Sequence, residues 1–201
     1  MDWKRIWALA VLVMTFGTAA ARAQGTDIAV RVFNNYGVPS DDLHEAQNHA
    51  AASLKAAGID VTWINCWYGD RAAVDAPGRC REGVGGDLVL RLQRASKAAG
   101  DGYVSLGFSL VMPEGIPFLA TVYADIAEGV ARRAGVETRP LLGRAIAHEI
   151  GHLLLNSNSH PDRGLMRGAW SQRELRTNAP HDWEFGQSEA DTMRTAVIRR
   201  R

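Results

Sequence analysis

A stretch of 13 residues, HEIGHLLLNSNSH, contains side chains whose types and spacing could carry chemistry. His148 and His152 are four residues apart, and Glu149 follows the first of them. On an α-helix, residues four apart point the same way, so the two imidazoles can bind one ion. Glu149 would lie to one side, where its carboxylate can face a water held by that ion. The spacing therefore predicts a metal centre with an adjacent general base.

The residues around the two histidines predict a helix with one apolar side. Pro140 suits a first helical turn, and Asn156 is expected to end the helix in the left-handed conformation. The simpler alternative is that the two histidines and the glutamate are ordinary solvent-facing residues. It does not explain why all three are gathered on one side of the helix. The apolar positions lie opposite the histidines at helical spacing: Leu142, Ile146, Ile150, Leu153 and Leu154.

Zinc is the ion that this set of residues predicts, because imidazole suits it and a catalytic zinc keeps three protein ligands and one open position. The third ligand has to come from outside the helix. His160 is the candidate, since the turn-forming residues 156–159 can lead the chain back. A carboxylate from a later helix, Glu174 or Glu189, is the alternative. The remaining histidines are not expected to be ligands: His44, His49 and His181.

Such a centre favours hydrolysis of an amide bond. Zinc lowers the pKa of a bound water to about 7, and Glu149 can accept its proton and deliver it to the leaving amine. The sequence therefore predicts a zinc-dependent peptidase, a hydrolase with peptide or protein substrates. Two alternatives stay open: a metal-stabilised protein that binds a peptide or wall component without turnover, and a zinc amidase acting on a non-peptide amide. Glu149 favours an enzyme, because a structural zinc has four protein ligands and needs no base.

The N-terminus predicts export. Lys4 and Arg5 precede an apolar run that ends near Ala20, and a small-x-small motif, Ala-Arg-Ala, follows. The run of about 15 apolar or small residues falls short of the roughly 20 that span a bilayer. We expect residues 1–23 to be a cleaved signal peptide and residues 24–201 to be one secreted or periplasmic domain without stable membrane association. About four residues separate this site from the first predicted strand, so no propeptide is expected.

The charge of the chain gives no reason to expect a nucleic-acid partner. The formal net charge is +1 for the whole chain and becomes −1 when residues 1–23 are removed. A near-neutral domain lacks the basic surface that binds phosphates.

Two cysteines, Cys66 and Cys80, are expected to form a disulfide. An exported protein folds in an oxidising compartment, where an even number of cysteines favours pairing. A thiolate metal site or a catalytic thiol is the alternative, but the pair lacks CxxC spacing and an adjacent histidine.

The pattern of apolar residues predicts an α+β fold: a mixed, mostly parallel five-stranded twisted sheet, a helix that carries the histidines, and a small helical C-terminal part. Ser40 is expected to cap the first helix, and Gly58 to end it. Gly107 is expected to mark a bulge. Strands are expected at 28–33, 61–67, 87–93, 103–111 and 118–123, and helices at 40–57, 125–133, 138–155, 171–176 and 187–199.

These residues resemble those of the metzincin clan of zinc endopeptidases, nearest to its matrixin-like and archaemetzincin-like members. The resemblance is carried by HEIGH at 148–152, His160 and Gly-Leu-Met at 164–166. It covers roughly residues 27–170, although only residues 148–166 match specifically.

The resemblance implies a role for each matching residue. Met166 would lie in the turn beneath the metal, and it follows His148 by 18 residues, as in matrixins. The substrate would lie extended along an edge strand, here within residues 103–112. The implied zinc ligands are His148, His152 and His160, with Glu149 as the general base.

The sequence also departs from the clan pattern. Leu155 and Asn158 stand where the clan has glycine and the third histidine, so the turn before His160 is two residues longer. Gly168 stands where some members have a tyrosine two residues after the methionine. Transition-state stabilisation from such a tyrosine is therefore not expected.

Overall fold

The structure, a computed structural model, describes residues 26–66, 80, 85–95 and 105–200. The predicted signal peptide, residues 1–23, lies outside these ranges and stays a prediction. Among the described helices, none combines the length and the apolar composition that crossing a lipid bilayer requires.

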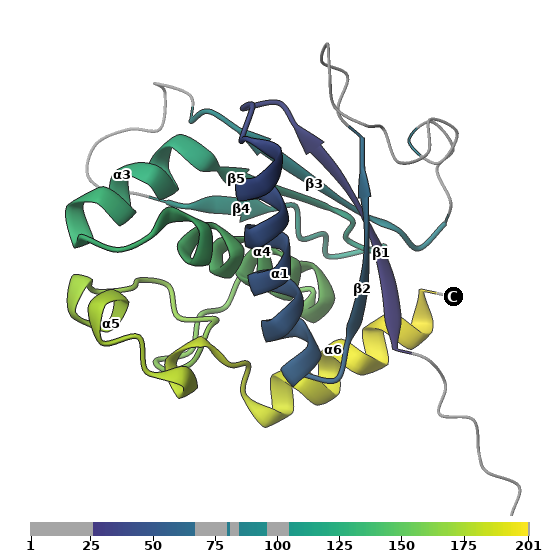
Figure 1. Ribbon diagram of the computed structural model, residues 1–201. Coiled ribbons are helices and arrows are strands. Elements are labelled where there is room, and N and C mark those ends of the chain that lie inside the picture. The colour runs from purple at the N-terminus through teal and green to yellow at the C-terminus, as the bar shows by residue number, and fades with distance from the viewer. Residues whose placement is uncertain (1–25, 67–79, 81–84, 96–104, 201) are drawn as a thin grey trace, which may run out of the picture.

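A five-stranded sheet forms one layer of the molecule (Figure 1). The strand order is β2-β1-β3-β5-β4, and neighbouring strands run parallel except β4, which is antiparallel to β5. This confirms the mixed, mostly parallel sheet, because a helical crossover between strands makes them parallel. The strands are β1 (Asp27–Asn34), β2 (Asp60–Asn65), β3 (Leu88–Gln93), β4 (Gly107–Ser109) and β5 (Leu119–Tyr123).

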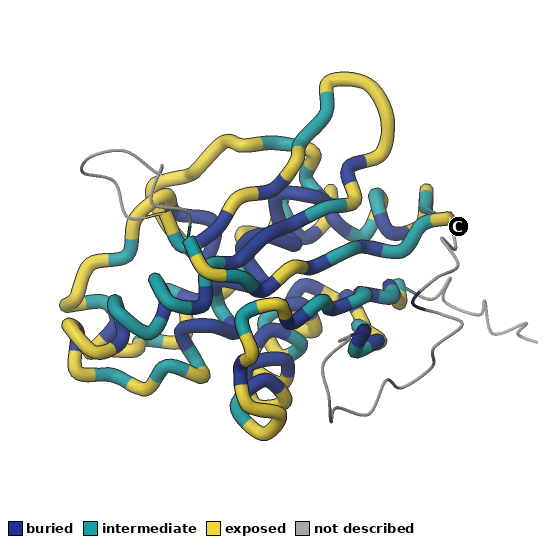
Figure 2. The backbone as a smooth tube through the Cα atoms, turned by 90° about the horizontal axis from the view of Figure 1, so that it is seen from above, coloured by how far each residue is buried: buried dark blue, intermediate teal, exposed yellow. Residues whose placement is uncertain are grey.

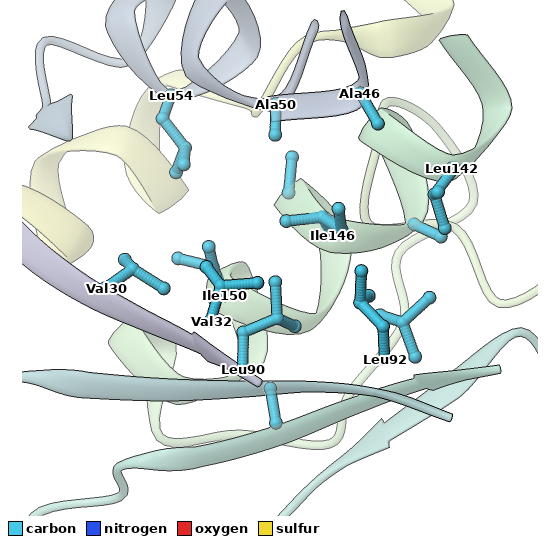
Figure 3. Close-up of a cluster of buried hydrophobic side chains, with 14 of the residues drawn as sticks. Val30, Val32, Ala46, Ala50, Leu54, Leu90, Leu92, Leu142, Ile146 and Ile150 are labelled. Atoms are coloured by element: carbon cyan, nitrogen blue, oxygen red, sulfur yellow. The ribbon is translucent and has the colours of Figure 1, made fainter. Parts of the chain in front are cut away.

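Two long helices, α1 (Ser40–Ala56) and α4 (Thr138–Leu155), cover one face of the sheet (Figures 1 and 3). They approach closely because Gly143 has no side chain: a Cβ there would lie 2.5 Å from the Ala46 carbonyl oxygen. The helical C-terminal part is also as expected. The other helical segments are α3 (Ala124–Ala134), α5 (Gln172–Thr177), the 3-10 helix η1 (Pro180–Trp183) and α6 (Gln187–Arg199).

The core lies between the sheet and these two helices. Alternate residues of β1 and β3 point to the helices, as the period of a strand requires, and apolar residues of α1 and α4 meet them (Figure 3). Figure 2 shows buried residues in the central strands and helix and exposed residues at the periphery. The labelled core residues are Val30, Val32, Ala46, Ala50, Leu54, Leu90, Leu92, Leu142, Ile146 and Ile150.

The predicted cap of α1 is wrong by one residue. The helix begins at Ser40 itself, and the N-cap residue is Pro39, which makes no side-chain hydrogen bond to the helix. Proline has no side-chain acceptor, so the backbone N–H groups of the first turn lack that partner. Gly58 follows the end of the helix in the left-handed conformation, φ +80°, as expected.

The fourth strand is shorter than the predicted range 103–111. Residues 103 and 104 lie outside the described part of the chain, and within residues 105–111 only Gly107–Ser109 form β4. The Val111 N–H then bonds to the Ser109 carbonyl, so the chain turns away. The predicted bulge at Gly107 is absent, because its pairing with Val122 continues in regular register. β4 is the last strand in the sheet order, which confirms that this segment is an edge.

The predicted disulfide joins Cys66 and Cys80, whose Cα atoms are 5.4 Å apart. Both cysteines are buried beside Ile64, and Ala29 and Phe33 pack against them. The bond therefore ties Cys80 to the end of β2, at the sheet edge opposite β4.

Candidate metal centre

Helix α4 and the turn after it bring three histidines together. The Nε2 atom of His152 lies 3.0 Å from Nε2 of His148 and 3.1 Å from Nε2 of His160. Within the described part of the chain, these three residues form the one group of histidine, cysteine or acidic residues that could hold a metal ion. The longer turn expected from the sequence thus still returns His160 to the helix.

Backbone carbonyls determine which nitrogen of two imidazoles carries the proton. His148 Nδ1 lies 2.9 Å from the Leu165 carbonyl oxygen, and His152 Nδ1 lies 2.6 Å from that of Ser157. A carbonyl can only accept a hydrogen bond, so both Nδ1 atoms are donors. In the neutral rings the Nε2 atoms then carry lone pairs that face one another. Lone pairs this close repel, and a cation between them removes the repulsion.

The end of α4 fixes one of these carbonyls. Asn156 adopts the left-handed conformation, φ 48° and ψ 44°, as predicted for the helix end. This turn aims the Ser157 carbonyl back at the His152 ring. One residue therefore both stops the helix and orients a histidine.

Burial keeps the His148 and His152 imidazoles neutral. Desolvation lowers the pKa of His148 to about 4, against the raising effect of the Leu165 carbonyl, and the neighbouring histidines lower it further. Burial also lowers the pKa of His152. Neutral rings at pH 7 are the form that binds metals.

Glu149 faces the same site from a buried position, with 5% of its surface exposed. Desolvation raises the pKa of its carboxyl to about 7, although a hydrogen bond with Ser109 lowers it. The Ser109 hydroxyl lies 2.8 Å from Glu149 Oε2 and 2.7 Å from the Glu149 carbonyl oxygen. A carboxyl with a pKa near neutrality can accept and release a proton at working pH. Sequence reasoning missed Ser109, because its strand is remote from the histidines in the chain.

The turn at Met166 supports the helix from below. Met166 is fully buried, and a Cβ on Gly151 would lie 2.6 Å from its sulfur. The preceding residue, Leu165, supplies the carbonyl that holds His148. Met166 therefore packs against the helix that carries the histidines, and the glycine of HEIGH is the residue that leaves room for it.

Two tryptophans, which the sequence did not single out, extend the packing outward from the site. Trp170 meets His148 edge to face with ring centroids 5.7 Å apart, and Trp183 meets Trp170 at 5.4 Å. The Arg144 guanidinium lies over Trp183, 3.8 Å from the ring centroid. These contacts hold the ring of one histidine in place through apolar neighbours.

The structure explains why glycine stands at position 168, where some metzincins carry tyrosine. A Cβ there would lie 3.2 Å from Cγ of His160. The ring of His160 thus occupies space beside Gly168 that a side chain would need.

The alternative ligands lie outside the cluster. Glu174 accepts from the Ser171 N–H, and Glu189 from the Gly186 N–H, so each carboxylate caps its own helix. The three histidines not expected to be ligands are exposed and also outside the cluster: His44, His49 and His181.

A cleft of about 900 Å³ opens over the cluster. It is lined by β4, by the histidines and Glu149 of α4, and by Trp170 and the α5 residue Leu175. Val130 and Ala145 add apolar lining, so a side chain of a bound molecule could be buried beside the histidines.

No family model and no curated protein sequence matches the chain. Solved structures do. A zinc-dependent peptidase from Methanocorpusculum labreanum aligns with a TM-score of 0.52 and 14% identity over 84% of this chain and 99% of that one. Archaemetzincin from Methanopyrus kandleri aligns with a TM-score of 0.50 and 17% identity, over 88% and 98%. The chain has an archaemetzincin-like fold.

A third structure has the same fold within a longer protein. Metalloproteinase-II from Bacteroides fragilis aligns with a TM-score of 0.52 and 16% identity over 86% of this chain, which spans 54% of that protein. The metzincin-like fold that the resemblance implies is therefore confirmed. At these sequence identities the comparison shows the fold alone.

Proposed function

We propose that this protein is an exported zinc-dependent peptidase. The observation that carries the proposal is the convergence of three imidazole Nε2 atoms, two of which are turned inward by carbonyls on Nδ1. Structures of similar fold include proteins described as a zinc-dependent peptidase and as a metalloproteinase.

The donor set fits zinc. Two ligand nitrogens of a tetrahedral zinc, each bonded at roughly 2.0–2.1 Å, are about 3.3 Å apart. Nε2 of His152 lies at a similar distance, 3.0 and 3.1 Å, from Nε2 of the other two histidines, and all three ligand atoms lie within 4.8 Å of one another. His148, His152 and His160 would hold the ion and leave its fourth position to the cleft. Zinc bound in this way acts as a Lewis acid that makes water nucleophilic near neutral pH and polarises a carbonyl.

Glu149 would serve as the general base and then as the general acid. Its carboxyl lines the cleft beside the histidines, and its pKa of about 7 suits transfer of a proton in both directions. The carboxylate takes the proton of the attacking water, and the carboxyl then gives it to the leaving nitrogen of the amide. These are the two proton transfers that peptide hydrolysis needs.

The edge strand offers a place for an extended substrate. β4 ends the sheet order, and its residues line the cleft next to Glu149. A peptide that adds itself to this edge would present a backbone carbonyl to the metal centre while its side chains alternate between cleft and solvent.

Export is supported by the signal-like N-terminus and by the disulfide between Cys66 and Cys80. Disulfides form and persist in oxidising compartments such as the periplasm and the extracellular space. N-terminal sequencing of the protein recovered outside the cytoplasm tests this part, and a first residue other than Gln24 contradicts the expected cleavage site.

The test of the proposed function compares the wild type with Glu149→Ala and His160→Ala. Zinc content is measured by atomic absorption, and turnover by hydrolysis of a peptide library. We expect one zinc per chain in the wild type. Glu149→Ala should retain the metal and lose turnover, about 10²- to 10⁴-fold for removal of a general base. His160→Ala should lose much of the metal.

His181→Ala is the matched control, because this histidine is exposed and outside the cluster. It should keep both zinc and activity. Retention of zinc by His160→Ala contradicts the ligand assignment. A wild type that binds zinc but cleaves no peptide would instead favour a peptide-binding protein or an amidase of non-peptide substrates.

A further inference from the structure

The edge strand β4 confines both carboxyl oxygens of Glu149. Gly107 and Ser109 are two residues apart, so they share one face of the strand, and both are buried. A Cβ on Gly107 would lie 2.8 Å from Glu149 Oε1, and the Ser109 hydroxyl lies 2.8 Å from Oε2. One oxygen is therefore accommodated by a missing side chain, and the other is held by a hydrogen bond.

We propose that Ser109, with Gly107 beside it, is the positioning residue for the Glu149 carboxyl. β4 then has a second task besides offering an edge to the substrate: it fixes the general base. The inference rests on the proposed function for its catalytic meaning, while the contact itself is tested separately below.

A hydroxyl is well suited to this task because it both donates and accepts. Ser109 Oγ reaches Glu149 Oε2 and also the Glu149 carbonyl oxygen, at 2.7 Å, but has one proton for the two. When Glu149 is a carboxylate, the hydroxyl donates to Oε2. When the carboxyl carries a proton on Oε1, Oε2 still accepts the hydrogen bond from the Ser109 hydroxyl. The contact survives proton transfer in both directions.

Positioning matters because glutamate is a flexible side chain whose ordering costs conformational entropy. A catalytic group displaced by about 1 Å can lose roughly 10²-fold in rate. Loss of the Ser109 hydrogen bond alone should lower the rate by less than this, because Gly107 and the buried surroundings still confine the carboxyl. We therefore expect an effect of about tenfold.

The kinetic test uses Ser109→Ala and Ser109→Thr in the full chain. Ser109→Ala should lower kcat about tenfold with KM and zinc content unchanged, because the three histidines and the backbone edge of β4 that would pair with a substrate are not altered. Ser109→Thr keeps the hydroxyl on a residue that suits strands and should restore most of kcat. Thr121→Val is the matched control: it removes a buried hydroxyl from neighbouring β5, outside the residues that line the cleft, and should leave kcat unchanged.

A second readout needs no activity. Denaturation midpoints are measured for four metal-free proteins: wild type, Ser109→Ala, Glu149→Ala and the double variant. If the two side chains interact, Ser109→Ala should lower the denaturation midpoint by less when Glu149 has already been replaced. The reason is that the effects of substitutions at contacting residues on stability do not simply add.

The proposal is overturned if the two substitutions shift the denaturation midpoint additively, or if kcat is unchanged in Ser109→Ala. Loss of zinc in Ser109→Ala also overturns it, because the serine would then be a support of the metal centre as a whole. If the wild type cleaves no peptide but the midpoints are coupled, the proposed function fails while the Ser109–Glu149 contact stands. The two failures are therefore distinguishable.

Discussion

Met166 packs against Gly151 at a point of α4 where no larger residue fits. A Cβ on Gly151 would lie 2.6 Å from the Met166 sulfur and 2.8 Å from a ring carbon of Phe185. Gly151 lies between the two histidines of the helix, and the residue before Met166 holds one of them. The contact therefore couples the packing of the turn to the orientation of the histidines proposed as metal ligands.

Gly151→Ala should destabilise the protein and weaken metal binding together. The added methyl forces Met166 and Phe185 to move, and overpacking of this kind costs about 1–3 kcal/mol. Urea denaturation measures the stability, and zinc titration with a competing chelator measures the affinity. Gly85→Ala is the control, because a Cβ on Gly85 meets no atom of the described residues within 4 Å. Equal stabilities for the two variants contradict the packing argument.

Asn156→Ala should lower stability by about 1–2 kcal/mol, because alanine pays the cost of the left-handed conformation, and Asn156→Gly should be tolerated. The alanine variant should also bind zinc less tightly, since the turn aims the Ser157 carbonyl at His152. Asn178→Ala provides the comparison: Asn178 is also left-handed, φ 52°, but follows α5. It should lose stability and keep zinc affinity, and an equal loss of affinity in both would refute the link through Ser157.

Glu149→Gln should stabilise the metal-free protein at pH 8. The folded-state pKa of Glu149 is raised to about 7 by desolvation, from 4.5. The favourable contribution of this carboxyl to the stability of the folded protein is present below pH 4.5. It is lost as the pH rises through 7, where the buried carboxyl must become charged. Neutral glutamine avoids that charge, so the variant should gain about 1–3 kcal/mol at pH 8 and little near pH 5.

Denaturation of both metal-free proteins across this pH range measures the difference at position 149. The histidines are present in both proteins, so their titration largely cancels. A stability difference that grows as the pH falls has the wrong sign for a desolvated carboxyl and would contradict the burial argument.

Replacing Cys66 and Cys80 by alanine should lower stability by about 3 kcal/mol, the value for a closed loop of about 15 residues. Zinc content should not change, because the disulfide lies at the end of β2 and the metal centre beside β4, at opposite edges of the sheet. Denaturation midpoints and zinc analysis of the double variant check both points. Loss of zinc from the folded variant would show that the two edges are coupled.

Local patterns in the sequence were sufficient for most of the fold. The helix that carries HEIGH was predicted because its apolar residues recur at helical spacing, and α6 was predicted over its observed range, Gln187–Arg199. The sheet class followed from the order of strands and crossover helices. Boundaries were less accurate at β4, where pairing with β5 and not strand propensity decides the length.

The sequence by itself determined the two helical histidines as a pair, the break of the helix at Asn156 and the pairing of the two cysteines. Each of these depends on spacing along a single segment or on residue type. Tertiary structure alone decided that His160, and neither Glu174 nor Glu189, joins the pair, and that Ser109 from a distant strand meets Glu149. The physical reason is that these contacts cross between segments. Their distances are set by how the sheet, α4 and the following turn pack together, which local spacing does not encode.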